Sequence, residues 1–164
     1  MAPTDPALAP GAERALTGGE RDMARAVFGG ALDPDPVRVR RRKWFPLQPR
    51  GTVMAPCGHI HFHPCSRRYS DDFSQEGAGL RGLFIHELTH VWQSQTRGHL
   101  WLVLMRHPFC RYGYELRPGK PFAAYGIEQQ AEIVRHWFLA ETGTPDPSAG
   151  PLSALRRLVP FTED

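Results

Sequence analysis

Cysteine is scarce in this chain and is not arranged in pairs. The 164 residues hold three cysteines, Cys57, Cys65 and Cys110, with no CxxC spacing among them. An odd number without such pairs excludes a framework of several disulfides and a structural zinc site made of four cysteines. A single bridge between Cys57 and Cys65 would require an oxidising compartment. Free thiols are the alternative that we favour.

The sequence also lacks a long hydrophobic run and a secretory signal. No apolar stretch approaches the roughly 18 residues that span a membrane, and residues 1–16 have neither a basic start nor an apolar segment. The net charge is +3, and basic residues are scattered except at 38–43, where a charged strand edge is preferred over a patch for an anionic partner. We expect synthesis in the cytoplasm, delivery by other machinery, and neither membrane nor nucleic acid as a partner.

Length and composition predict a single folded domain with loosely structured ends. A chain of 164 residues can bury a hydrophobic core. Glycine and proline, at 16 each, favour many loops and few long strands. We predict a disordered Ala/Pro-rich tail over residues 1–15, the folded domain over 16–141, and a Pro/Gly-rich linker with a short last helix over 142–164.

Hydrophobic periodicity predicts both helices and short strands within the domain. Helical patterns cover residues 20–28, 80–97 and 127–139, and alternation favours a strand at 37–40. Residues 53–55 and 60–62, on either side of Pro-Cys-Gly at 56–58, are interpreted as a strand pair or a single bulged strand. The apolar segment 99–105 is interpreted as a second buried helix or a wall of the core. The combination predicts an α+β fold in which two long helices pack with a small, partly antiparallel sheet.

The helix predicted over residues 80–97 contains the sequence His-Glu-Leu-Thr-His at positions 86–90. Residues four apart lie on one face of a helix, so His86 and His90 can bind a single Zn²⁺ at about 2.0–2.1 Å each. Glu87 is adjacent, where its carboxylate can act as the general base of a hydrolase. Ordinary polar histidines on a half-exposed helix are the alternative, which the apolar neighbours on both sides of the motif disfavour.

A catalytic zinc needs a third protein ligand, and the motif does not supply it. Gln93 and Thr96 stand where an extended HExxHxxGxxH motif would require other residues. Glu128 and Glu132 share one face of the second long helix, 127–139. This helix resembles the ExxxD and ExxAD helices of gluzincin-type metallopeptidases, which implies Glu128 as the zinc ligand and Glu132 as the residue that supports a ligand histidine. The reverse assignment stays open.

Peptide hydrolysis also needs a group that stabilises the negative charge of the transition state. The segment between the two helices offers several side chains that can donate a hydrogen bond. Tyr114 and Tyr125 are our main candidates, and the others are Tyr112, His107 and Arg111. The sequence does not choose among them.

Three histidines alternate along the strand region at 59–63. His59, His61 and His63 would share one strand face and could form a second metal site, but an exposed strand face without a metal is the preferred interpretation. The same region, close in sequence to the motif helix, is our candidate for an edge strand that pairs with an extended substrate.

These motifs resemble a known family. The segment 83–93, LFIHELTHVWQ, and the segment 126–133, GIEQQAEI, together with DDFS at 71–74 and the helix ERDMARAVFG, resemble the zinc metallopeptidase domain at the C-terminus of some VgrG spike proteins of type VI secretion systems, often labelled Rhs/Vgr-related. The resemblance covers roughly residues 16–140. It implies a gluzincin-like, zincin-like fold, one Zn²⁺, and ligands at His86, His90 and a glutamate of the EQQAE segment.

The resemblance also implies a biological role. It predicts a zinc metallopeptidase that acts as an antibacterial effector in the periplasm of target cells, with a secretion spike and an immunity protein as partners. Its substrate would be a peptide or protein, or the peptide bonds of peptidoglycan. The alternative is a catalytically inactive zinc-binding interaction module of a secretion apparatus, which the presence of Glu87 disfavours.

Overall fold

The computed structural model describes residues 7–105 and 110–161, which form five α-helices and a small mixed sheet. The α+β prediction is therefore confirmed. The helices are α1 Gly18–Phe28, α2 Ala78–Arg97, α3 His99–Met105, α4 Ile127–Glu141 and α5 Leu152–Leu158, with single 3₁₀ turns η1 Gly29–Ala31, η2 Phe73–Gln75 and η3 Phe122–Ala124. No helix in the described part of the chain is long and apolar enough to cross a membrane.

The sheet has four short strands in the order β1-β2-β4-β3. They are β1 Glu13–Ala15, β2 Arg38–Arg40, β3 Val53–Met54 and β4 Ile60–Phe62. β1 with β2 and β3 with β4 are antiparallel, whereas β2 and β4 are parallel. Val39 of β2 and Ile60 of β4 are paired and fully buried, which fixes the inward face of the sheet. β3 is left at one edge, as the sequence predicted for this region.

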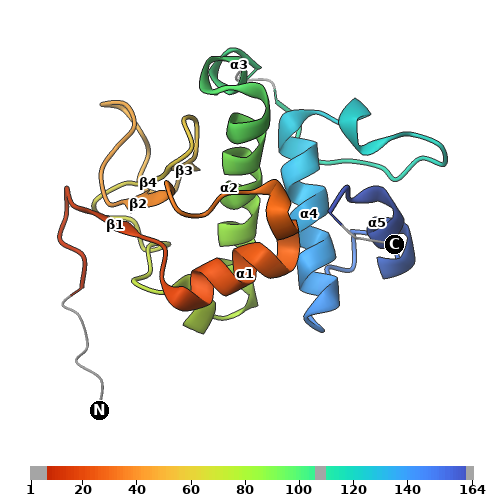
Figure 1. Ribbon diagram of the computed structural model, residues 1–164, viewed down its shortest axis with the longest axis horizontal. Helices are drawn as coiled ribbons and strands as arrows, with labels where there is room; N and C mark the ends of the chain where they lie inside the picture. Colours follow the sequence, from red (N-terminus) through yellow and green to blue (C-terminus); the bar gives the residue numbers. More distant parts are fainter. Residues whose placement is uncertain (1–6, 106–109, 162–164) are drawn as a thin grey trace.

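The long helix α2 lies between the sheet and α4 (Figure 1). Its middle turns, residues 84–91, are buried on every side, including the polar residues of the motif. α4 can approach closely because Gly82 has no side chain: a Cβ there would lie 3.3 Å from Arg135 and Leu139 of α4. This contact fixes how α4 is rotated against α2, and thereby which of its side chains meet the histidines.

Two predicted features of the fold need correction. Residues 13–15 were predicted to be disordered, but they form β1, because pairing with β2 satisfies their backbone groups. Segment 99–105 is helical as predicted but not buried: it lies at the end of α2, where Leu100 and Leu104 are 71% and 72% exposed. The last helix exists, and it packs on the core through Leu155, with Phe161 stacked edge-on against Phe28.

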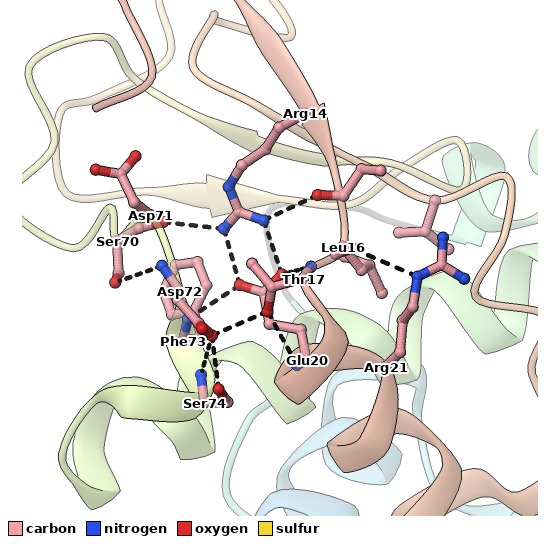
Figure 2. A network of polar contacts seen from close by, with 12 residues as sticks. Arg14, Leu16, Thr17, Glu20, Arg21, Ser70, Asp71, Asp72, Phe73 and Ser74 are labelled. Atoms are coloured by element: carbon pink, nitrogen blue, oxygen red, sulfur yellow. Dashed lines mark hydrogen bonds and ion pairs between the residues drawn. The ribbon is translucent and has the colours of Figure 1, made fainter. Parts of the chain in front are cut away.

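A buried carboxylate links the first helix to the segment that leads into α2 (Figure 2). Glu20 is fully buried and accepts hydrogen bonds from the Arg14 guanidinium at 2.7 and 2.8 Å. It also accepts from the backbone N–H groups of Thr17 and Phe73, each at 2.9 Å. Together these donors replace the water that the carboxylate loses on burial, so this network holds β1, α1 and η2 in register.

We expect Glu20→Ala to destabilise the fold by about 3–5 kcal/mol, because it leaves the Arg14 charge and two backbone N–H groups without their partner. Urea unfolding followed by circular dichroism should show a lower midpoint with an unchanged slope. Asp22→Ala is the control on the same helix, since Asp22 makes only an exposed contact with Arg25, and it should change stability by less than about 0.5 kcal/mol. Equal effects of the two substitutions would contradict the role given to Glu20.

Candidate metal centre

The helix α2 brings His86 and His90 together, as their spacing predicts. Their Nε2 atoms lie 3.2 Å apart. The Oε2 atom of Glu128, from α4, lies 3.3 Å from His86 Nε2 and 3.0 Å from His90 Nε2. All three side chains are buried, with 6%, 1% and 1% of His86, His90 and Glu128 exposed. Two helices therefore direct three donor atoms at one point.

The chemistry and spacing of these donors fit a bound metal ion. Two ligand atoms bound tetrahedrally to zinc at about 2.0–2.1 Å lie about 3.3 Å from each other, close to the 3.0–3.3 Å separations here. Two imidazole nitrogens and a carboxylate oxygen are close together in a buried space, where their lone pairs repel one another. A bound cation would remove this repulsion. Among the described residues this is the only such group of histidine, cysteine, aspartate or glutamate side chains.

Gln93 orients His90, a role that the sequence did not reveal. Its side-chain oxygen lies 2.8 Å from His90 Nδ1. An amide oxygen only accepts, so Nδ1 carries the proton and leaves the lone pair on Nε2, toward Glu128. The Gln93 amide nitrogen donates to Ile127 O and to Gln130 Oε1, both at 3.0 Å. The position of Gln93, three residues after His90, was the available signal.

Glu132 supports the other histidine. Its Oε1 atom lies 2.7 Å from His86 Nδ1, and its second oxygen is 3.5 Å from His136 Nε2. Burial by itself lowers the pKa of His86, but the carboxylates of Glu128 and Glu132 outweigh it and raise that pKa to about 9. Glu128 approaches both histidines and Glu132 approaches His86, and their assignment as metal ligand and supporting residue stays a prediction.

Glu87 points into a cleft beside the two histidines. This Glu87 cleft has a volume of about 400 Å³ and is lined by Gly51, Thr52, Val53, Arg68, Leu83, His86, Glu87, Tyr112, Glu132 and Arg135. Glu87 is only 3% exposed, and its Oε2 atom has no hydrogen-bond partner among the described residues. A buried carboxylate oxygen without a partner is costly unless a ligand or water completes it. The geometry therefore leaves Glu87 available for chemistry.

The candidate residues for transition-state stabilisation lie in different places in the structure, and one of them lines the cleft. Tyr112 lines the Glu87 cleft, and its ring is stacked near that of His86, with centroids 6.2 Å apart. The hydroxyl of Tyr114 is instead hydrogen-bonded to His136, and that of Tyr125 donates to the backbone of Glu115. Neither of these two main candidates lines the cleft, whereas Tyr112 does, and the choice of the stabilising side chain stays a prediction. Arg111 lies in a separate hollow with Glu128, and His107 lies outside the described residues.

The alternating histidines do not form a second metal site in the described part of the chain. His61 points into the protein and is 3% exposed, which corrects the expectation of an exposed strand face, while His59 and His63 are partly exposed. The cysteines are all free thiols. The edge strand β3 lies at the cleft through Val53, with Thr52 directly before it, so the region predicted to pair with substrate borders Glu87.

A helix carrying HExxH, a second helix carrying the glutamate, and a small sheet with its edge at the cleft define a zincin-like metalloprotein fold. No protein-family model matches the chain. A solved structure, the effector domain of Pseudomonas aeruginosa VgrG2b, is 40% identical, with a TM-score of 0.69 over 84% of this chain and 80% of that one. The chain belongs to the family of that effector domain, which confirms the resemblance seen in the sequence.

The same relationship extends to a full-length protein. The chain is 43% identical over 144 residues to the type VI secretion system spike protein VgrG2b of Pseudomonas aeruginosa. The match covers 84% of this chain but only 14% of that protein. The chain therefore corresponds to a small part of the spike protein, in the context of a secretion apparatus.

Proposed function

We propose that this protein is a zinc metallopeptidase. The observation that carries the proposal is the combination of a buried three-donor site with an adjacent carboxylate that has no partner and faces a cleft. A purely structural zinc site would use four protein ligands, and the described residues offer three. The alternative, a catalytically inactive zinc-binding interaction module, gives no reason for burying Glu87 at the cleft.

The residues have distinct tasks in this mechanism. His86, His90 and Glu128 would hold the metal. Gln93 would orient His90 through their hydrogen bond, and the nearby Glu132 carboxylate would support His86 by its charge. When bound, zinc lowers the pKa of a water molecule and polarises a carbonyl group. Glu87 accepts a proton from the attacking water and passes it to the leaving amide nitrogen. Tyr112, which lines the cleft, would donate a hydrogen bond to the substrate carbonyl oxygen, a role for which Tyr114 and Tyr125 were the main candidates from the sequence.

The edge strand gives the cleft a means of holding a peptide. β3 has a hydrogen-bonded neighbour, β4, on one side only, so its other edge can pair with an extended substrate. Thr52 and Val53 lie at this edge, in the same cleft as Glu87. Strand pairing of this kind would hold the peptide backbone across the site without requiring a particular side chain.

The family relationship suggests where the reaction takes place. Because the relative is a type VI secretion spike protein, we propose that this domain is delivered by such a system and acts as an antibacterial effector in the periplasm of target cells. A secretion spike and an immunity protein of the producing cell are the implied partners. Peptide or protein, including peptidoglycan peptides, is the substrate class.

Removal of the metal should test the peptidase proposal directly. The purified protein is expected to contain one zinc per chain and to cleave a denatured protein or a mixed peptide library. Dialysis against a strong chelator should abolish cleavage, and zinc should restore it, because the water is activated only when the metal is present. Periplasmic expression should stop growth. A zinc-loaded protein that cleaves nothing and is harmless in the periplasm would instead support the inactive binding module.

A further inference from the structure

The Glu87 cleft is lined by two arginines, Arg68 and Arg135, which differ in whether an acidic side chain neutralises their charge. Arg135 lies 3.3 Å from Glu132 and so has an ion-pair partner within the cleft. The Arg68 side chain has no ion-pair partner in residues 7–105 and 110–161, and the one hydrogen bond there that involves Arg68 uses its backbone N–H. Arg68 is exposed, and it still forms part of the wall of the cleft. One positive charge in the cleft is therefore available to a ligand.

The acids of the cleft already have other tasks. Glu132 contacts His86 and Arg135, and Glu87 is buried beside the reaction centre. On the metal side, a bound Zn²⁺ carries more positive charge than the single carboxylate of Glu128 neutralises. With the metal in place, the cleft therefore has an excess of positive charge. Arg68 is the exposed positive side chain of the cleft wall, so a substrate side chain can reach it.

We propose that Arg68 makes this cleft selective for peptides that carry a carboxylate side chain close to the bond that is cut. The inference rests on the proposed peptidase function. A guanidinium presents a planar fork of N–H donors that matches a carboxylate, so it favours Glu or Asp over neutral residues of the same shape. A peptide paired with β3 would present alternate side chains to the cleft. Lysine at the same position is disfavoured by like charge.

The preference is measurable with matched peptides. A cleaved sequence is first found with a mixed peptide library, and Glu, Gln or Lys is then placed at each position flanking the cleaved bond. At one of these positions we expect kcat/KM for Glu to exceed that for Gln by about tenfold, with Lys lower still. The advantage should shrink as salt is raised, because Arg68 is exposed to solvent.

Substitution of Arg68 assigns the preference to this residue. In Arg68→Ala, KM for the Glu peptide should rise about tenfold with kcat little changed, and the Gln peptide should be unaffected, which is the pattern of lost substrate binding. Arg68→Glu should shift the preference to the Lys peptide. Arg67→Ala is the matched control: Arg67 is the neighbouring exposed arginine and does not line the cleft. It should leave every KM unchanged.

The outcomes separate this inference from the proposed function. Cleavage of Glu and Gln peptides with equal efficiency, or equal losses on both in Arg68→Ala, would overturn the selectivity and leave the peptidase standing. If the wild type cut no peptide, binding of the same labelled peptides to the zinc-loaded protein would be measured by fluorescence anisotropy. A preference for the Glu peptide that depends on Arg68 would then support the charge selectivity alone, and equal binding of the Glu and Gln peptides would overturn it.

Discussion

Glu87→Gln is expected to keep the bound zinc and lose about 10²–10⁴-fold in kcat for peptide cleavage. The amide has the shape of the carboxylate but cannot accept a proton from water. Since Glu87 is not one of the three converging donors, the metal site is expected to stay intact. Zinc content by mass spectrometry, kcat at saturating peptide, and growth on periplasmic expression are the measurements, and growth should be restored in the variant.

Glu115→Gln provides the matched control for this charge removal. Glu115 has a side chain that is 81% exposed and lies outside the Glu87 cleft, so this substitution should leave cleavage unchanged. A Glu87→Gln protein that retains more than about a tenth of the wild-type kcat would exclude Glu87 as the general base, given the contribution such a group makes. Loss of zinc from that variant would assign Glu87 a part in metal binding instead.

A large loss of zinc affinity is expected when Glu128, the proposed third metal ligand, is replaced. Glu128→Ala should weaken zinc binding by more than about 100-fold, because it removes the carboxylate oxygen that converges with both Nε2 atoms. Glu132→Ala removes a residue that orients His86 without joining the converging atoms, and it should weaken binding by about 10–100-fold. Competition with a chromophoric chelator measures both affinities under the same conditions.

The comparison of the two glutamates decides the assignment that the sequence left open. A larger loss in Glu132→Ala than in Glu128→Ala would reverse their roles. Both variants should retain the helical circular dichroism of the wild type. The Glu20 network, which holds α1 against the segment before α2, includes neither glutamate.

Much of the site could be predicted because its determinants are local. The spacing of His86 and His90 places them on one face of any helix, and the apolar residues around them make that helix a buried one. Glu128 and Glu132 share a helix face for the same reason. Residues 53–55 and 60–62 were predicted as a strand pair or a bulged strand, and they form the antiparallel pair β3 and β4.

The predictions failed where contacts with segments distant in sequence determine the local structure or the burial of a residue. β1 exists only because β2 lies beside it, so the composition of residues 1–15 was misleading. The apolar pattern of 99–105 predicted burial, yet no other element covers most of α3 within the described residues. The sequence did not choose among the candidate tyrosines, because the path of the loop decides: it takes the Tyr114 hydroxyl to His136 and leaves Tyr112 at the cleft.

The sequence by itself determined the relative positions of His86, Glu87 and His90, since all three lie on one helix. Only the tertiary structure decided which glutamate meets both histidines, that Gln93 holds His90, and that Arg68 stands in the cleft. The physical reason is that helical periodicity fixes only the directions of side chains around the axis of their own helix. The rotation of α4 against α2 is set by their packing at Gly82, and no local pattern encodes it.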